Sequence, residues 1–354
     1  MSSKPLLSIV LLLSLGCAHH MPAVAPATGR VVLAAGGPEM KDPFGVALDR
    51  GGTLFVVEEE ANRVLRVGGD GRIGLFAGTG AKGDGGDGGP AVAAVLNNPH
   101  HIAFAPGNQD DLIIADTLNG RVRRVDHLTG VITTIAGSAK GFGGDGGPAL
   151  QAQFANVFCM AFDRAGTKLY LADTNNRRVR SVDLRTGVTA TEAGNGEKGS
   201  PPDGADARQA PLLDPRAIAV DSQSNLYIVE RNGHVLRVVD RNGKIRTVAG
   251  TGQKGFSGDG GPALAAAMNG PKHLAVDAED NVLIVDTENH VIRKYLPREG
   301  LMVRVAGSGT RGAGGVGGPA EAVEMDRPHG AYVDGAGAIY ISDSNNHRVL
   351  KLVK

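Results

Sequence analysis

Three side chains with metal-binding groups occupy one position of a phrase that the sequence repeats. His101, Cys159 and His273 each stand two residues after the residue that opens their copy of the phrase, which reads PHHIAFA at 99–105. Imidazole nitrogens and a thiolate sulfur are ligands that suit zinc or copper. His100 and His329 stand one position earlier in their copies and add further nitrogen. If the copies surround a common axis, we expect these side chains to converge on it.

Two interpretations of this convergence remain open. One is a divalent-metal site built from His101, Cys159 and His273, with zinc or copper as the expected ion. The other is a set of polar channel side chains that bond to backbone or to water. The sequence contains no G-x-S-x-G, H-E-x-x-H or Walker-type motif, so we assign no catalytic residue. Binding is therefore expected, with a metal-dependent lyase or lactonase at the mouth of a central channel as the alternative.

The repeated phrase belongs to a unit that occurs six times, at intervals of 56 to 58 residues. Its copies are PFGVALD (43–49), PHHIAFA (99–105), VFCMAFD (157–163), PRAIAVD (215–221), PKHLAVD (271–277) and PHGAYVD (328–334). Each copy is followed by further short apolar runs, separated by turns rich in glycine, asparagine and aspartate. Four short strands per unit predict an all-β, six-bladed propeller. The second and fifth blades are then opposite each other, so His101 should face His273.

The sixth unit stops after its third run, RVLKLV at 348–353. The phrase that would close it, GRVVLAAG, stands instead at 29–36. We therefore predict that the N-terminal strand completes the last blade and closes the ring, which leaves no large unprotected edge. The propeller domain is expected to span residues 30–354 and to be monomeric.

The turns that follow the second strands share a signature. They read DTLNGRV (116–122), DTNNRRV (173–179), DTENHVI (286–292) and DSNNHRV (343–349). This pattern resembles the NHL-repeat family, and the resemblance covers essentially all of residues 30–354. It implies a propeller fold, but it leaves activity open because the family includes binding platforms and lyase- and lactonase-like proteins. Amidating-lyase relatives hold zinc with histidines near the axis, whereas no matching set of three histidines is recognisable here.

Long loops connect the blades, and their sequences are alike. They contain KGDGGDGGPA (82–91), KGFGGDGGPA (140–149), KGSPPDGADA (198–207), KGFSGDGGPA (254–263) and RGAGGVGGPA (311–320). In an up-and-down blade these loops share one face with the turns after the second strands. We predict that this long-loop face, with His100 and His329 at its centre, binds a protein or a small ligand. The loop aspartates are expected to accept backbone N–H groups in turns, with a calcium site as the alternative: Asp87, Asp145, Asp203 and Asp259.

A second set of acids closes the second strand of each unit. Arginines stand five residues after several of them, as in Glu58 and Arg63 or Asp116 and Arg121, and also in Asp173 with Arg178 and Asp343 with Arg348. Because the arrangement recurs in many blades, we interpret it as a structural ion pair rather than a site of chemistry.

The composition excludes one class of partner. The chain has 37 basic and 37 acidic residues, so its formal net charge is zero and no basic patch for nucleic acid is indicated. Aromatic residues make up only 4%, which disfavours an aromatic cage or a sugar-stacking platform.

The N-terminus predicts export to the cell envelope. Lys4 precedes a short apolar run, and residues 1–17 resemble a bacterial lipoprotein signal that ends at Cys17, the expected lipidation site. Ala18 favours the outer membrane, to which the lipid would anchor the protein. Residues 18–29, rich in proline and alanine, are expected to form a flexible tether. Lipidated Cys17 would leave Cys159 without a disulfide partner.

Overall fold

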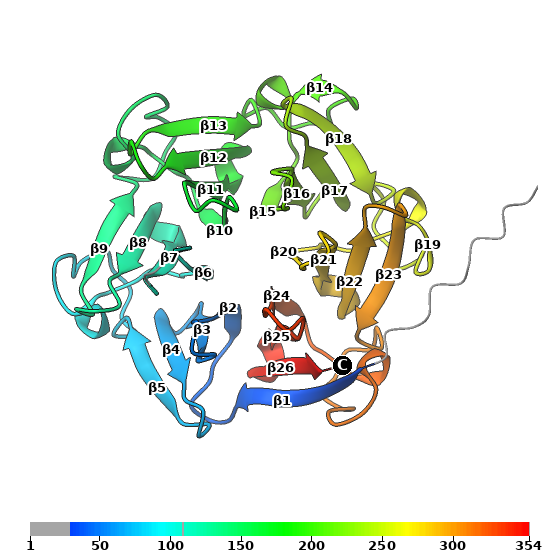
Figure 1. Cartoon of the computed structure of the whole chain (residues 1–354), viewed down its shortest axis with the longest axis horizontal. Coiled ribbons are helices and arrows are strands. Elements are labelled where there is room, and N and C mark those ends of the chain that lie inside the picture. Colours follow the sequence, from blue (N-terminus) through cyan, green and yellow to red (C-terminus); the bar gives the residue numbers. More distant parts are fainter. Residues whose placement is uncertain (1–28, 108–109, 354) are drawn as a thin grey trace, which may run out of the picture.

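Six antiparallel sheets surround a central axis in the computed structural model, which describes residues 29–107 and 110–353 (Figure 1). The predicted six-bladed all-β propeller is therefore confirmed. The predicted signal segment, Cys17 and nearly all of the tether lie outside the described residues. No helix in the described part of the chain is long and apolar enough to cross a membrane.

In each blade the strands follow one another from the axis outward. Blade 1 contains β2 (Pro43–Leu48), β3 (Leu54–Glu58), β4 (Arg63–Val67) and β5 (Ile73–Ala77). Blade 2 contains β6 (His101–Phe104), β7 (Leu112–Asp116), β8 (Arg121–Val125) and β9 (Ile132–Ala136). Blade 3 contains β10 (Val157–Phe162), β11 (Lys168–Asp173), β12 (Arg178–Asp183) and β13 (Thr189–Ala193).

The other three blades have the same order, with additions at the outer edge. Blade 4 contains β15 (Pro215–Val220), β16 (Leu226–Glu230), β17 (Val235–Val239), β18 (Lys244–Ala249) and the short β14 (Ala205–Asp206). Blade 5 contains β20 (His273–Val276), β21 (Val282–Asp286), β22 (Val291–Leu296), β23 (Leu301–Ala306) and the short β19 (Gly261–Pro262). Blade 6 contains β24 (Pro328–Val333), β25 (Ile339–Asp343), β26 (Arg348–Val353) and β1 (Arg30–Gly36).

The N-terminal strand closes the ring as predicted. Strand β1 pairs antiparallel with β26, and Arg30 lies opposite Val353 (Figure 1). Apolar residues of the second strands, such as Val56, Ile114 and Ile284, are fully buried between neighbouring blades. Burial of each such side chain contributes about 1.5–3 kcal/mol, and contacts of this kind fix the blades against one another.

Nine single-turn 3-10 helices complete the described residues. Four follow the second strands: η2 (Thr117–Asn119), η4 (Thr174–Asn176), η7 (Thr287–Asn289) and η9 (Ser344–Asn346). Five follow the glycine-rich part of the long loops: η1 (Ala91–Ala93), η3 (Ala149–Gln151), η5 (Ala207–Gln209), η6 (Ala263–Ala265) and η8 (Ala320–Ala322). Four of this second group begin directly after a loop proline, whereas η5 begins after Asp206.

Each long loop crosses to the outer edge of the next blade. Gly88 donates its N–H to the carbonyl of Ile132 at 2.8 Å, and Ile132 donates to Gly89 at 3.0 Å. In blades 4 and 5 the same contact is regular enough to form β14 and β19. The loops are therefore connectors that cover the edge strands, which would otherwise expose unpaired backbone groups.

The loop aspartates bind buried arginines of the blade they cover. Asp259 lies 2.7 Å from a guanidinium nitrogen of Arg293, whose side chain is fully buried. Asp87 with Arg123 and Asp145 with Arg180 repeat this contact, which we call the loop clamp. Asp203 instead accepts the backbone N–H of Thr247 in β18 at 2.8 Å. This contact joins the loop to a strand and is not the local turn contact that was expected.

The predicted ion pairs at the ends of the second strands need a correction. Glu58 and Asp343 do pair with the arginines five residues later, Arg63 and Arg348. Asp116, Asp173, Glu230 and Asp286 contact the arginines seven residues later: Arg123, Arg180, Arg237 and Arg293. In three of these blades the same guanidinium also binds the loop aspartate. Arg123, Arg180 and Arg293 therefore each pair with two acids, and their side chains are fully buried.

Candidate functional site at the propeller axis

Six side chains close the axis at the long-loop face. They come from the same position at the start of each inner strand and form the axial plug: Phe44, His100, Phe158, Arg216, Lys272 and His329. The rings of Phe44 and His329 stack at 4.1 Å, and His100 contacts both Phe44 and Phe158 edge-on. His100 and His329 were expected at the centre of an accessible face, but they are buried in this plug.

The cationic half of the plug is held by polar and π contacts. The Arg216 guanidinium lies 3.8 Å from the centre of the Phe158 ring, an arrangement in which a desolvated cation gains from the π face. Lys272 Nζ lies 3.2 Å from His329 Nε2 and donates to Glu288 at 2.9 Å. Burial lowers the pKa of Lys272 to about 8 and that of Arg216 to about 10, so Arg216 is a cation at neutral pH. The plug therefore combines aromatic packing with positive charge.

His101, Cys159 and His273 do converge beneath the plug, as the repeat predicted. Each offers one ligand atom within 4.8 Å of the others, and all three side chains are buried. The rings of His101 and His273 lie 5.0 Å apart, across the axis. Among the described residues this is the only group of three or more His, Cys, Asp or Glu side chains close enough to share an ion.

The hydrogen bonds of the two histidines define their tautomer. His101 Nδ1 accepts the backbone N–H of Met160, and His273 Nδ1 accepts that of Ala331, both at 3.4 Å. Burial lowers the pKa of His101 to about 4, and burial also lowers the pKa of His273, so both rings are neutral at pH 7. A neutral ring that accepts at Nδ1 carries its proton on Nε2. Each histidine therefore offers an N–H donor, and His273 Nε2 has no hydrogen-bond partner among the described residues.

Cys159 is a thiol in this environment. Burial raises its pKa to about 11, and Sγ lies 3.6 Å from the carbonyl of Ile218, to which the thiol donates. A zinc ligand would be the thiolate, and zinc-binding imidazoles would need free Nε2 lone pairs. The short distances between the three ligand atoms would suit a metal ion. The Nε2–H groups of the two histidines and the protonated thiol are donors, however, and they suit a ligand with an acceptor group. Binding an ion would require both backbone N–H bonds to Nδ1 to be given up.

A cavity of about 350 Å³ continues along the axis from His101 and His273. Its lining side chains are mostly apolar, although backbone polar groups are also exposed in it, and alanine occupies one equivalent position in five of the six inner strands: Ala47, Ala103, Ala161, Ala219 and Ala275. Tyr332 takes this position in blade 6. The small methyl groups leave space that larger side chains would fill. The axial cavity is therefore an apolar chamber with two imidazoles at the end nearest the plug.

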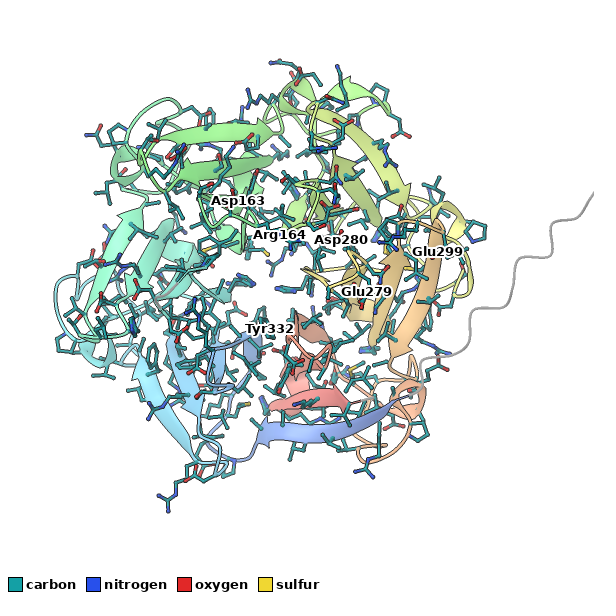
Figure 2. All side chains as sticks on the ribbon, in the orientation of Figure 1. Asp163, Arg164, Glu279, Asp280, Glu299 and Tyr332 are labelled. Carbon is teal, nitrogen blue, oxygen red and sulfur yellow. The ribbon has the colours of Figure 1, made fainter. Side chains whose placement is uncertain are left out.

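Turns between the first and second strands surround the other end of the axis. Figure 2 labels Asp163, Arg164, Glu279 and Asp280 near the centre of the ring, with Tyr332 facing them. Asp280 accepts the N–H of Ser222 at 2.8 Å, a bond that joins the turns of blades 4 and 5. The mouth of the axial cavity at this end is thus polar and charged, while the side chains inside the cavity are mostly apolar.

Sequence reasoning found the convergent residues but placed them at the long-loop face. The structure puts the plug at that end and the cavity on the opposite side of His101 and His273. The row of alanines was visible in the six phrases and could have indicated a chamber. The plug was not visible, because its closure depends on contacts between unlike side chains.

Two family descriptions match parts of the chain. The Teneurin NHL domain matches residues 148–257, and the NHL repeat matches residues 325–352. These matches support an NHL-repeat family, as the resemblance implied.

The curated relatives are much longer proteins. SUPPRESSOR OF QUENCHING 1, chloroplastic, of Arabidopsis thaliana is 25% identical over 264 residues, which is 72% of this chain and 24% of that protein. Teneurin-1 of Gallus gallus is 32% identical over 157 residues, or 39% of this chain and 6% of that protein. The chain thus spans less than a quarter of the length of these relatives.

Solved structures share the fold at low sequence identity. A Bacteroides thetaiotaomicron protein of unknown function matches with a TM-score of 0.70 at 16% identity, covering 92% of this chain and 76% of its own. An auxiliary nutrient binding protein of Bacteroides ovatus matches with 0.65 at 15%, covering 92% and 77%. Virginiamycin B lyase of Staphylococcus aureus matches with 0.57 at 14%, covering 92% and 99%. At these identities the likeness establishes the fold alone.

Proposed function

We propose that this chain is a non-catalytic binding propeller that holds a small ligand in the axial cavity. The observation that carries the proposal is the unpartnered Nε2–H of His273 at the end of an apolar chamber. A buried donor without a partner is costly, and a ligand acceptor would satisfy it. Ligand pockets commonly have this form, with apolar walls and a few placed polar groups.

The expected ligand has an apolar body and one oxygen acceptor, such as a carbonyl or a carboxylate. A volume of about 350 Å³ is near the lower end of small-molecule sites, so the ligand is small. Arg216 is a buried cation whose charge lowers the pKa of both histidines, and it favours an acceptor with negative charge. Two structural neighbours are auxiliary nutrient binding proteins of Bacteroides, which is in keeping with such a role.

The location we propose is the cell envelope. Residues 1–17 would direct export, Cys17 would carry a lipid in the outer membrane, and residues 18–29 would tether the propeller. The long-loop face would then remain available to a protein partner, through the loops that carry Asp87, Asp145, Asp203 and Asp259. Labelling with radioactive palmitate in wild type and Cys17→Ser tests the anchor, and equal label in both contradicts it.

Extraction of the purified full chain tests the ligand. Protein purified without denaturant is unfolded, and the released small molecules are identified by mass spectrometry. We expect one apolar acceptor molecule per chain, which Ala103→Leu reduces by filling the chamber. Ala190→Leu, on the outer strand β13, is the matched control and should retain it. Absence of any released molecule, together with no thermal stabilisation by fatty acids or other apolar carboxylates, would contradict the proposal.

His273→Phe isolates the hydrogen bond. The substitution keeps a planar ring but removes Nε2–H, so affinity for an acceptor-bearing ligand should fall about tenfold, the worth of one hydrogen bond. Affinity for the matching hydrocarbon without the acceptor should not change. An equal loss for both ligands would indicate that the histidine only shapes the chamber.

A metal-dependent lyase or lactonase is the second candidate, because three potential ligand atoms lie within 4.8 Å of one another. In that case His101, His273 and Cys159 would hold zinc, and the ion would polarise a substrate carbonyl. Metal analysis of untagged protein separates the candidates. One zinc ion per chain, lost in His101→Ala or His273→Ala, would favour the enzyme. Protein that contains no metal and whose stability does not change with added zinc would favour the binding propeller.

A further inference from the structure

The outer strands of five blades are covered in the same way by the preceding long loop. One residue per strand exchanges backbone hydrogen bonds with the glycines of the loop, for example Thr189 with Gly146 and Gly147 at 2.7 and 3.0 Å. In blade 6, Val31 bonds to Gly317 and Gly318 at 2.7 and 3.1 Å. The five equivalent residues are all 0% exposed: Val31, Ile132, Thr189, Ile245 and Met302.

Strand β5 of blade 1 is the exception. The connection from Gly36 to Pro43 is too short to reach it, and no described residue pairs with its outer edge. Ile73, the residue equivalent to the five buried ones, is partly exposed. Leu75 is 46% exposed. The edge is therefore an apolar strand with free backbone groups, the kind of edge that accepts an added strand.

The side chains beside this edge define what fits on it. In blade 3 the loop clamp consists of Asp145, Arg180 and Thr191, whose hydroxyl donates to Asp145 at 2.6 Å. Arg180 and Thr191 lie opposite each other in the β12–β13 register. In blade 6 the equivalent pair is Leu350 and Leu33, and the loop carries Val316 where the others carry aspartate. All three equivalent positions are therefore apolar in blade 6, where Leu350 is buried and Leu33 and Val316 are 56% and 39% exposed.

Blade 1 has the apolar version without its loop. Leu65 lies opposite Leu75 in the β4–β5 register, where an arginine and a threonine would be needed to receive an aspartate. A carboxylate placed there would lose water without gaining a cation. An aliphatic side chain would avoid this cost and would lie against the two leucines. The position therefore favours an apolar residue, as Val316 does in blade 6.

A charged groove adjoins the start of β5. It has a volume of about 310 Å³, and its lining includes Arg66, Arg72 and Asp70. Arg72 precedes Ile73 as Arg30 precedes Val31, and Arg30 pairs with Pro319 of the covering loop. Glu321 follows that proline by two residues. An acid at the same distance after proline would approach Arg66 and also Arg72, which lies 3.4 Å from Asp70.

We propose that β5 is a docking edge for an extended partner segment of the form apolar–Gly–Gly–Pro–Ala–acid. The segment adds to blade 1 as a fifth strand, in the way that residues 316–321 add to blade 6. Its glycines exchange backbone hydrogen bonds with Ile73, its aliphatic residue covers Leu65 and Leu75, and its acid faces Arg66 and Arg72. The partner is a separate protein, and the interaction is independent of the axial ligand.

Two labelled peptides test the docking edge against the purified full chain. One copies residues 311–324, with valine before the Gly-Gly-Pro-Ala stretch. The other copies residues 254–267, with aspartate there. We expect the valine peptide to bind at least tenfold more tightly in fluorescence anisotropy. Equal binding, or no binding of either peptide, overturns the proposal.

Two variants locate the binding. Leu75→Lys, at an exposed position, should abolish binding without lowering the melting temperature, and unchanged binding would overturn the proposal. Leu65→Arg combined with Leu75→Thr rebuilds the polar pair and should reverse the preference between the peptides. If that double variant does not fold, Leu75→Lys decides alone.

Hydrogen exchange on the free full chain tests for a competing occupant. The Ile73 amide should exchange rapidly in the free protein and become protected by the valine peptide. Protection of Ile73 in the free chain would overturn the proposal, since it would mean that this edge is already covered. A dimer in sedimentation that Leu75→Lys dissociates would also overturn it, by assigning the edge to a second copy.

Discussion

The rim of the propeller and its axis use side chains in opposite ways. At the rim, Arg123, Arg180 and Arg293 are all fully buried and each binds one acid of its own blade and one of a loop. At the axis, equivalent positions hold unlike residues, such as His101, Cys159 and Gly45. Repetition of these arginine–acid contacts therefore maintains the architecture, and variation at the axis brings together the imidazole and thiol groups. In a repeat protein the residues that break the repeat are the ones to test for function.

The largest effect is expected at the rim. Arg293→Leu leaves Asp286, which is 0% exposed, without its cation, and it also releases Asp259 of the loop. Removing one partner of a buried ion pair typically costs about 3–5 kcal/mol. Urea unfolding followed by circular dichroism should show a loss of this size. A loss below about 1 kcal/mol would mean that water reaches the site and replaces the arginine.

The chain supplies its own control for this experiment. Blade 6 carries Val316, Arg348 and Leu350 where blade 5 carries Asp259, Val291 and Arg293. The triple variant Asp259→Val, Val291→Arg, Arg293→Leu copies blade 6 and should recover most of the lost stability. If stability is not recovered, the polar contact of blade 5 and the apolar contact of blade 6 each depend on other residues of their own blade.

The next effect concerns the axis and pH. The ordinary pKa of His101 is 6.5, and in the folded protein it is about 4 because of burial. Between these values the unfolded chain binds a proton that the folded chain does not, so stability falls as pH falls. A shift of this size corresponds to about 3 kcal/mol between pH 7 and pH 4. His101→Gln should remove that part of the acid sensitivity. The measurement is the urea midpoint of unfolding of the wild type and of the variant, compared at each pH between 4 and 7. Parallel pH profiles for wild type and variant would contradict it.

A smaller effect should follow from mixing the two kinds of clamp. Val316→Asp places a carboxylate over blade 6, which has Leu350 where the other clamps have arginine. Val316 is 39% exposed, so the carboxylate keeps much of its water and the cost should be about 1 kcal/mol. Leu350→Arg added to this variant should reduce the cost. Thermal denaturation of the single and double variants measures both steps.

The smallest effect is expected for an ion pair at the surface. Arg185 lies 3.8 Å from Asp183, and its side chain is 75% exposed. Arg185→Ala should change the unfolding free energy by less than about 0.5 kcal/mol, because water screens such pairs. A loss comparable to that of Arg293→Leu would contradict the distinction between buried and exposed pairs.

The number and spacing of the repeated phrases in the sequence were enough to predict the blade number, the opposition of His101 and His273, and the closure of the ring. Six phrases at constant spacing specify six blades, and a separation of three units places His101 and His273 on opposite sides of the axis. The closing phrase at 29–36 predicted the pairing of β1 with β26.

Features that depend on packing were predicted poorly. Arginines stand both five and seven residues after Asp116, on the same face of the strand, and only the arrival of Asp87 from the loop selects Arg123. The plug depends on the stacking of Phe44 with His329 and of Arg216 with Phe158, pairs that come from different blades. Such contacts leave no pattern in the local sequence. The sequence therefore predicted an accessible axis at the long-loop face, whereas the structure has the plug there and the cavity on the other side of His101 and His273.

The pairing of β1 with β26 also bears on how the chain is made. Arg30 meets Val353 across more than 300 residues of intervening sequence. Strand β1 is synthesised first, yet its partner emerges after all the other strands, while each of the first five blades can pair its own strands as they appear. Closure is therefore a late step with a large loop-closure cost, which slows folding. Until then the chain is an open arc with two unpaired edges, the state in which a chaperone would be most needed.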